Sequence, residues 1–189
     1  MTVFEEAVVF ALKAHAGTTR KAEKTPAVLH SLETAAVAGS MTDDPELLAA
    51  AVLHDTVEDT PTTLGDLREA FGARVAALVA SETEGKRAEL PPADSWQLRK
   101  AESLEVLKRG SIEVKILWLS DKLSNMRSFY RLWEKEGASL WRRFHQSDPA
   151  RQAWYYRGIA EYTAELSGTA AWREYVRLVD LVFGGTEKK

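Results

Sequence analysis

The sequence predicts an all-α fold, arranged as a single domain over residues 1–189. Apolar residues recur at helical spacing in most segments. Gly or Pro stands where these segments end. No segment keeps the alternation of apolar and polar residues that is typical of a strand. The chain is long enough for a sizeable core, and its apolar content of 45% excludes a disordered protein.

Three helices are expected in the N-terminal part of the chain. Residues 3–15 carry apolar residues at helical spacing, and Gly17 follows as a stop. After a polar, cation-rich loop, a second helix is expected over Ser31–Met41. Pro45 suits the first position of the third helix, with Asp44 as its N-cap.

Two shorter helices follow. Thr63 and Asp66 form a capping box for a helix that ends near Gly72. Residues 73–84 form the next helix, with Val75, Leu78 and Val79 directed inward. Residues 85–94 include two consecutive prolines, which cannot continue a helix. This stretch is expected to be either an active-site lid or an exposed loop.

The second half of the chain is expected to be helical throughout. Its predicted helices are one that starts near Asp94 or Ser95 and ends at Arg109, then Ser111–Glu134, Leu140–Phe144, Ala150–Leu166 and a last one over 172–183. The helix over Ser111–Glu134 is strongly apolar and aromatic, yet it contains Asp121 and Asn125 one turn apart. A charged residue in such a helix costs several kcal/mol unless it is compensated, so Asp121 calls for a partner.

Composition narrows the class of protein. The net charge of −3 argues against a nucleic-acid partner, because domains that bind nucleic acid are usually basic. The chain has no cysteine, so a metal must be held by histidine and carboxylate. The N-terminus lacks the pattern of a signal peptide, and no apolar run is long enough to span a membrane. These features predict a cytoplasmic protein without membrane contact.

The most informative stretch runs from Ala49 to Thr60, where a small-residue apolar helix leads into four ionisable side chains. On one helix, Glu58 lies four residues after His54, and Asp59 lies four after Asp55, so the four would share a face. A solvated helix face would mix Lys with Glu. A histidine beside carboxylates suits a divalent metal, and further carboxylates suit a hydrolytic water.

Four residues are candidates for one metal ion: His30, His54, Asp55 and Asp121. Two imidazoles and two carboxylates suit Mn²⁺, Fe²⁺ or Zn²⁺. Glu58 and Asp59 would then position the water or carry its proton. Taken singly, His30 is more often a core or helix-end histidine, and Asp121 could pair with Lys122; the joint pattern favours the metal.

These motifs resemble the HD superfamily of metal-dependent phosphohydrolases and, more closely, the hydrolase domain of RelA/SpoT-type alarmone enzymes. The resemblance covers about residues 3–170 and is closest to a stand-alone small alarmone hydrolase. The matching motifs are His15-Ala16-Gly17, Arg20-Lys21, Pro26 with His30, Leu53-His54-Asp55-Thr56-Val57-Glu58-Asp59-Thr60, Phe71-Gly72 and Leu119-Ser120-Asp121-Lys122-Leu123-Ser124-Asn125-Met126-Arg127.

The resemblance implies an all-helical, Mn²⁺-dependent enzyme that removes the 3′-pyrophosphate of ppGpp or pppGpp and leaves GDP or GTP. By matching position it implies that His30, His54, Asp55 and Asp121 hold the metal. It further implies catalytic roles for Glu58 and Asp59 and substrate contacts for the residues Arg20, Lys21, Lys122 and Asn125.

The sequence departs from the family beside the first metal histidine, where Pro26 is followed by Ala27 and not by tyrosine. This leaves the base open, so an adenosine alarmone is an alternative. Another is a different HD-type phosphohydrolase that acts on NADPH as a 2′-phosphatase, or on a nucleoside phosphate. A nucleotide sensor would be expected to lack Glu58 and Asp59 or a ligand, and a purely structural domain would leave the His54 face unexplained.

Three further features carry weaker predictions. Lys86, Arg87, Arg99 and Lys100 are candidate phosphate contacts or solvated surface charges. The aromatic run 154–156 either stacks on a base or belongs to the core. Core packing and a homo-oligomer contact explain the tryptophans Trp133, Trp141 and Trp154 equally well.

Overall fold

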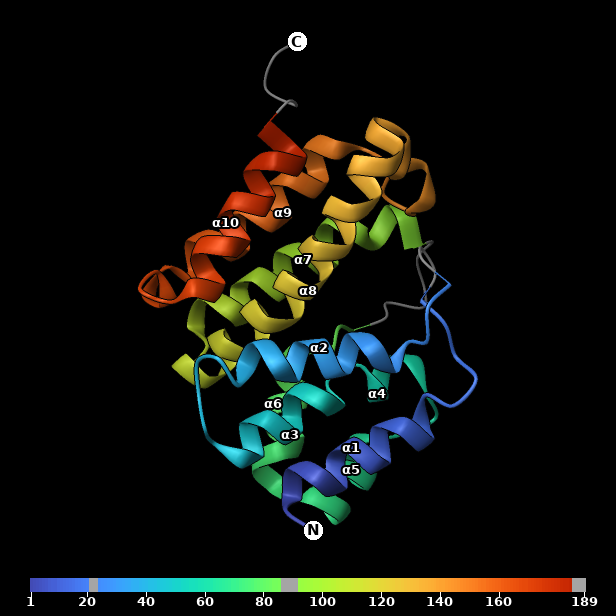
Figure 1. Ribbon diagram of the computed structural model, residues 1–189, viewed down its shortest axis with the longest axis vertical. Coiled ribbons are helices and arrows are strands. Elements are labelled where there is room, and N and C mark those ends of the chain that lie inside the picture. Colours follow the sequence, from blue (N-terminus) through green and yellow to red (C-terminus); the bar gives the residue numbers. More distant parts are fainter. Residues whose placement is uncertain (21–23, 86–91, 185–189) are drawn as a thin grey trace.

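The computed structural model describes residues 1–20, 24–85 and 92–184, and for residues 92–94 it describes the backbone alone. Within these ranges the chain is helical and contains no strand, which confirms the all-α prediction (Figure 1). The elements are α1 (Val3–Ala14), α2 (Val28–Ala38), α3 (Pro45–Leu53), α4 (Thr56–Asp59), α5 (Leu64–Phe71), α6 (Ala73–Glu82), α7 (Pro92–Arg109), α8 (Ile112–Glu136), the 3₁₀ helix η1 (Gly137–Arg143), α9 (Pro149–Tyr162), the 3₁₀ helix η2 (Ala164–Leu166) and α10 (Ala170–Phe183).

Several helix boundaries differ from the predicted ones. Helix α2 starts at Val28, earlier than predicted, because the carbonyl of Pro26 already accepts the amide of Leu29 in a first turn. The segment predicted as one helix to Leu166 divides after Tyr162, where the Thr163 hydroxyl donates to the carbonyl of Ile159. The short helix predicted over Leu140–Phe144 belongs to the 3₁₀ helix η1.

Two helices organise the packing around them. Helix α3, which is buried from Ala49 to its end at Leu53, contacts α1, α2, α6 and α8. Helix α8 contacts α2, α3, α6, α7, α9 and α10, and thereby joins the N-terminal helices to the C-terminal ones (Figure 1). None of the helices in the described part of the chain is both long and apolar enough to cross a membrane.

The stretch from Ala49 to Thr60 is not one continuous helix, so the prediction that its four ionisable residues share one helix face is wrong. Helix α3 ends at Leu53, His54 and Asp55 form a turn, and α4 begins at Thr56. Two side chains explain the break. The His54 ring bonds the carbonyl of Ala51 through Nδ1 at 2.9 Å, and the Thr56 hydroxyl donates to the carbonyl of Leu53 at 2.7 Å. These carbonyls would otherwise continue the backbone ladder.

Asp44 is the N-cap of helix α3, as predicted. Its carboxylate accepts the amides of Glu46 and Leu47 at 3.0 and 3.4 Å, and it pairs with the guanidinium of Arg74 on α6. Arg74 also bonds Glu46 and Glu113, so one cation connects α3, α6 and α8. The hydrogen bond from Arg74 is the main cause that holds the pKa of Asp44 below its ordinary value.

Substituting Asp44→Ala is expected to lower the free energy of unfolding by about 1–2 kcal/mol at pH 7, the usual cost of losing an N-cap. Because the folded-state pKa is depressed, this stabilisation is present above the unfolded pKa of about 4 and is lost as the pH falls through the folded pKa. Urea denaturation of both proteins at neutral and acidic pH measures the difference. The exposed neighbour Asp43 offers the control Asp43→Ala, which should unfold like the wild type at both pH values.

Candidate active site

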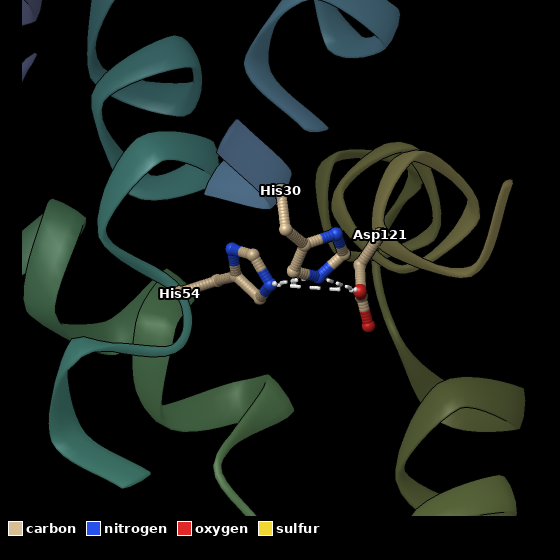
Figure 2. A group of neighbouring side chains, drawn as sticks. All are labelled: His30, His54 and Asp121. Carbon is tan, nitrogen blue, oxygen red and sulfur yellow. Dashed lines mark hydrogen bonds and ion pairs between the residues drawn. The ribbon is translucent and has the colours of Figure 1, made fainter. Parts of the chain in front are cut away.

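The four predicted metal ligands lie together at the junction of three segments. His30 comes from α2, His54 and Asp55 from the turn after α3, and Asp121 from α8. Figure 2 shows His30, His54 and Asp121 directed toward one another, and their candidate ligand atoms all lie within 4.8 Å of each other. The carboxylate of Asp55 lies 3.5 Å from Nε2 of His30 and 3.3 Å from Nε2 of His54. These four residues are called the His/Asp cluster below.

Hydrogen bonds at Nδ1 fix the orientation and the tautomer of the two imidazole rings. Nδ1 of His54 faces the carbonyl of Ala51, which can only accept, so Nδ1 carries the proton. Nδ1 of His30 lies 2.8 Å from the hydroxyl of Ser124, which donates to the carboxylate of Glu33 at 2.6 Å and therefore accepts from His30. Both Nε2 atoms thus direct lone pairs into the cluster, and they lie 3.2 Å apart.

The spacing of the cluster fits a divalent ion. Nε2 of His30 lies 2.8 Å from Oδ1 of Asp121, and Nε2 of His54 lies 3.5 Å from the same oxygen. Donor atoms held about 2.1 Å from one ion are separated by roughly 3.0–3.4 Å, depending on geometry. When both rings are neutral, their two Nε2 lone pairs and the two carboxylates repel one another at this spacing unless a proton or a metal ion lies between them. The donor set of nitrogen and oxygen suits a transition metal such as Mn²⁺, Fe²⁺ or Zn²⁺.

The charges of the cluster favour bound cations. Burial lowers the pKa of His54, but the carboxylates of Asp55 and Asp121 outweigh it and raise this pKa well above its ordinary value. Burial raises the pKa of Asp121, but the ammonium of Lys122 and the two histidines outweigh it and hold this pKa well below the usual range. Protons and a metal ion therefore compete for the same imidazole nitrogens, and metal affinity is expected to fall at acidic pH.

Three members of the cluster, His30, Asp55 and Asp121, line a cavity of about 540 Å³, a size common for small-molecule sites. Of the predicted substrate contacts, Arg20, Asn125 and Lys122 line this cavity. A guanidinium nitrogen of Arg20 donates to Asn125 at 2.7 Å, and Asn125 donates to Asp121 at 2.8 Å, so a hydrogen-bonded series leads from the cavity wall to the cluster. Lys21 lies outside the described residues, as do 86–91 of the stretch predicted as a lid or loop.

Lys122, a predicted substrate contact, is largely buried and is paired with carboxylates of the protein. Its side chain is only 14% exposed, and its ammonium pairs with Asp121 and lies 3.3 Å from Glu82. It also lies over the ring of Trp118. Burial lowers the pKa of Lys122, but the carboxylate of Asp121 outweighs it and holds this pKa well above its ordinary value. The lysine therefore carries a charge that compensates the buried Asp121.

The two predicted catalytic carboxylates face adjoining but different spaces. Asp59 is exposed and lines the 540 Å³ cavity. Glu58 lines a smaller cavity of about 60 Å³ together with His54, and it accepts the amide of Glu84 at 2.6 Å. Burial is the main cause that raises the pKa of Glu58 above its ordinary value. Asp55 of the cluster lines both cavities. Asp59 therefore shares one cavity with the cluster, and Glu58 shares the other.

Some residues of the large cavity had no signal in the sequence. Its lining includes residues at the end of η1, directly after it and on α9, namely Arg143, Phe144, His145 and Gln152. The core interpretation of the aromatic run is confirmed for Tyr155 and Tyr156, which are buried, whereas Trp154 is 40% exposed. Both tyrosines also line the cavity, and stacking on a base stays a prediction.

His15 also lines the cavity. It is buried, and neither ring nitrogen has a hydrogen-bond partner among the described residues. Burial lowers its pKa, which keeps the ring neutral at pH 7.

Comparison with known proteins adds a family and several relatives. Residues 7–146 match the model of the HD domain. The chain is 38% identical over 133 residues to a zebrafish protein named guanosine-3′,5′-bis(diphosphate) 3′-pyrophosphohydrolase MESH1, covering 68% of this chain and 70% of that one. It is 30% identical over 143 residues to a GTP pyrophosphokinase of Myxococcus xanthus, covering 74% of this chain but only 19% of that longer protein.

Two solved structures have a similar fold. One is lmo0812 from Listeria monocytogenes, with a TM-score of 0.71 and 36% identity, covering 82% of this chain and 99% of that one. The other is described as a metazoan orthologue of SpoT that hydrolyses ppGpp. It has a TM-score of 0.74 and 24% identity, covering 95% of this chain and 94% of that one, and at this identity the likeness concerns the fold.

Proposed function

The chain belongs to the HD-domain family, and from that premise we propose that it hydrolyses the 3′-pyrophosphate of ppGpp or pppGpp with the help of a divalent metal. The observation that carries the proposal is the convergence of the His/Asp cluster beside a cavity that is also lined by Arg20 and Asn125. The zebrafish relative named for this reaction supports the choice of substrate.

His30, His54, Asp55 and Asp121 would hold the metal, with Mn²⁺ as the proposed ion. When bound, it supplies Lewis-acid polarisation of a phosphoryl oxygen and lowers the pKa of water. Because both Nδ1 atoms are already hydrogen-bonded, the rings cannot turn their Nε2 atoms away from the cluster without breaking these bonds. The protein thus orients its nitrogen donors in advance.

In the proposed reaction, water adds to the phosphorus next to the 3′ oxygen, and the bond from this phosphorus to the 3′ oxygen breaks. Pyrophosphate leaves, and the 3′ oxygen regains a proton. Glu58, whose pKa is raised above its ordinary value chiefly by burial, is a stronger base than an exposed glutamate and accepts the proton of the water. Asp59 orients the water or returns the proton from the side of the larger cavity.

Arg20 and Asn125 are proposed to bind the nucleotide. Their mutual hydrogen bond places the guanidinium at the cavity wall, where it can contact phosphate in a bidentate way. Lys21 and Lys122 remain proposed contributors of positive charge. Cytoplasmic location and assembly into a homo-oligomer stay predictions from the sequence.

The test is a substrate panel with the purified chain and Mn²⁺. We expect release of pyrophosphate from ppGpp and no release in the double variant Glu58→Gln, Asp59→Asn, with products separated by ion-exchange chromatography. Release of pyrophosphate from the adenosine counterpart alone would show that the enzyme acts on an adenosine alarmone and not on ppGpp. Inorganic phosphate from NADPH alone would replace the proposal by a 2′-phosphatase, and no turnover of any substrate by the metal-loaded protein would contradict the proposed activity.

A further inference from the structure

The two histidines of the His/Asp cluster differ in what holds their rings. Nδ1 of His54 bonds the backbone carbonyl of Ala51, which can only accept, so the tautomer of this ring is fixed. Nδ1 of His30 lies instead 2.8 Å from the hydroxyl of Ser124. A hydroxyl can accept a hydrogen bond or donate one, so Ser124 by itself permits either tautomer of His30. A further group must therefore decide between the two tautomers.

The carboxylate of Glu33, on α2, holds the hydroxyl of Ser124 in one orientation. Its Oε2 accepts from this hydroxyl at 2.6 Å, and its Oε1 accepts from the guanidinium of Arg127 at 3.1 Å. Each oxygen thus has a donor of its own. The ion pair with Arg127 keeps Glu33 a carboxylate, which can accept at both oxygens. The hydroxyl proton of Ser124 is therefore directed at Glu33, and the hydroxyl oxygen accepts from Nδ1 of His30.

The opposite tautomer of His30 would also find a partner. Nε2 of His30 lies 2.8 Å from Oδ1 of Asp121. If Ser124 donated to Nδ1, the ring proton would sit on Nε2 and bond this carboxylate oxygen. A protonated Nε2 has no lone pair for a metal. Two arrangements of the same hydrogen-bonded series are thus available, and the one with Ser124 turned toward Glu33 leaves a nitrogen donor for the ion.

We propose that Glu33 is a positioning residue for the metal site: through the hydroxyl of Ser124 it selects the tautomer of His30 that can bind a divalent cation. The inference rests on the proposed metal-dependent function. Its parts lie where two packed helices meet, since His30 and Glu33 are one turn apart on α2, and Ser124 and Arg127 are one turn apart on α8. The packing of α2 on α8 therefore sets the chemistry of a metal ligand.

The test is Glu33→Gln, which keeps the shape of the side chain but replaces one acceptor oxygen by an amide donor. The guanidinium of Arg127 attracts the remaining oxygen, so the amide nitrogen faces Ser124, whose hydroxyl then donates to His30. We expect the Kd for Mn²⁺, measured by calorimetry on the full chain after chelator treatment, to rise about 10–100-fold, as for other groups that support metal ligands. Nitrogen NMR of the metal-free protein, at a pH where the ring is neutral, should show the proton of His30 moved from Nδ1 to Nε2.

A matched control is Glu174→Gln on α10. Glu174 accepts from Nε and Nη2 of the same Arg127 at 2.7 Å each, and its side chain is 32% exposed against 30% for Glu33. Both substitutions remove a charge beside Arg127, so an effect that acts through the stability of the fold would appear in both. We expect Glu174→Gln to keep the Mn²⁺ Kd and the His30 tautomer of the wild type.

Three results would overturn the inference: Glu33→Gln binds Mn²⁺ like the wild type, Glu174→Gln weakens binding as much as Glu33→Gln does, or His30 keeps its tautomer in Glu33→Gln. A wild type that binds no divalent ion contradicts the metal-dependent function and this inference with it. A wild type that binds Mn²⁺ and shows the Glu33 effect but leaves ppGpp intact supports the inference and contradicts the proposed substrate alone.

Discussion

Replacing His54 by Ala is expected to remove stoichiometric metal binding and to lower ppGpp hydrolysis by about a thousandfold or more, because bound metal contributes several kcal/mol to the transition state. His54 is fully enclosed, and its Nε2 faces His30, Asp55 and Asp121 at 3.2–3.5 Å. Metal content by mass spectrometry and turnover of ppGpp measure the two effects. Circular dichroism must show that the variant keeps its helices.

His145→Ala is the matched control for this substitution. His145 lines the same cavity but does not belong to the His/Asp cluster. Its removal should leave the metal content at the wild-type level, whatever it does to the KM. A folded His54→Ala protein that retains one metal ion with wild-type affinity would show that the cluster is not the metal site.

Glu58→Gln is expected to lower kcat by about 10²–10⁴-fold, the usual contribution of a general base, while the metal stays bound. A base must be ionised, so activity should fall as the pH falls through the raised pKa of Glu58. This decline should lie at a higher pH than for an exposed glutamate, whose pKa is about 4.3. The variant should lose this limb of the pH–rate profile.

The comparison requires pH–rate profiles of metal-loaded wild type and variant. Glu69→Gln, on the exposed surface of α5, is the control and should keep both the rate and the profile of the wild type. Wild-type turnover by a metal-loaded Glu58→Gln protein would exclude Glu58 as the base and direct attention to Asp59 in the larger cavity.

Much of the fold could be predicted because its signals are local. Asp44 with Pro45 marks the start of α3, and Thr63 with Asp66 forms the capping box of α5. The break at His54 could not be predicted from helical spacing, because it depends on side chains that bond backbone carbonyls in the folded chain. Spacing alone therefore placed Glu58 and Asp59 on one face, although they line different cavities.

Arg143 and Gln152 also line the cavity, but only because η1 and α9 pack near α8, so the sequence carried no signal for them. Glu82, by contrast, does carry a signal in the sequence. It lies four residues after Leu78 and three after Val79, on the face that these apolar residues direct into the core. A glutamate that continues a buried apolar face needs a partner, and here the partner is Lys122.

No single segment of the chain supplies more than two members of the His/Asp cluster, which draws on α2, the turn after α3, and α8. The site therefore does not exist in any partly unfolded form in which α8 has separated from the N-terminal helices. Ligand binding and folding are then thermodynamically linked, and a metal at a hundred times its Kd would add about 2.7 kcal/mol to the stability of the whole chain. Supply of the ion would govern the lifetime of the protein as well as its rate of turnover.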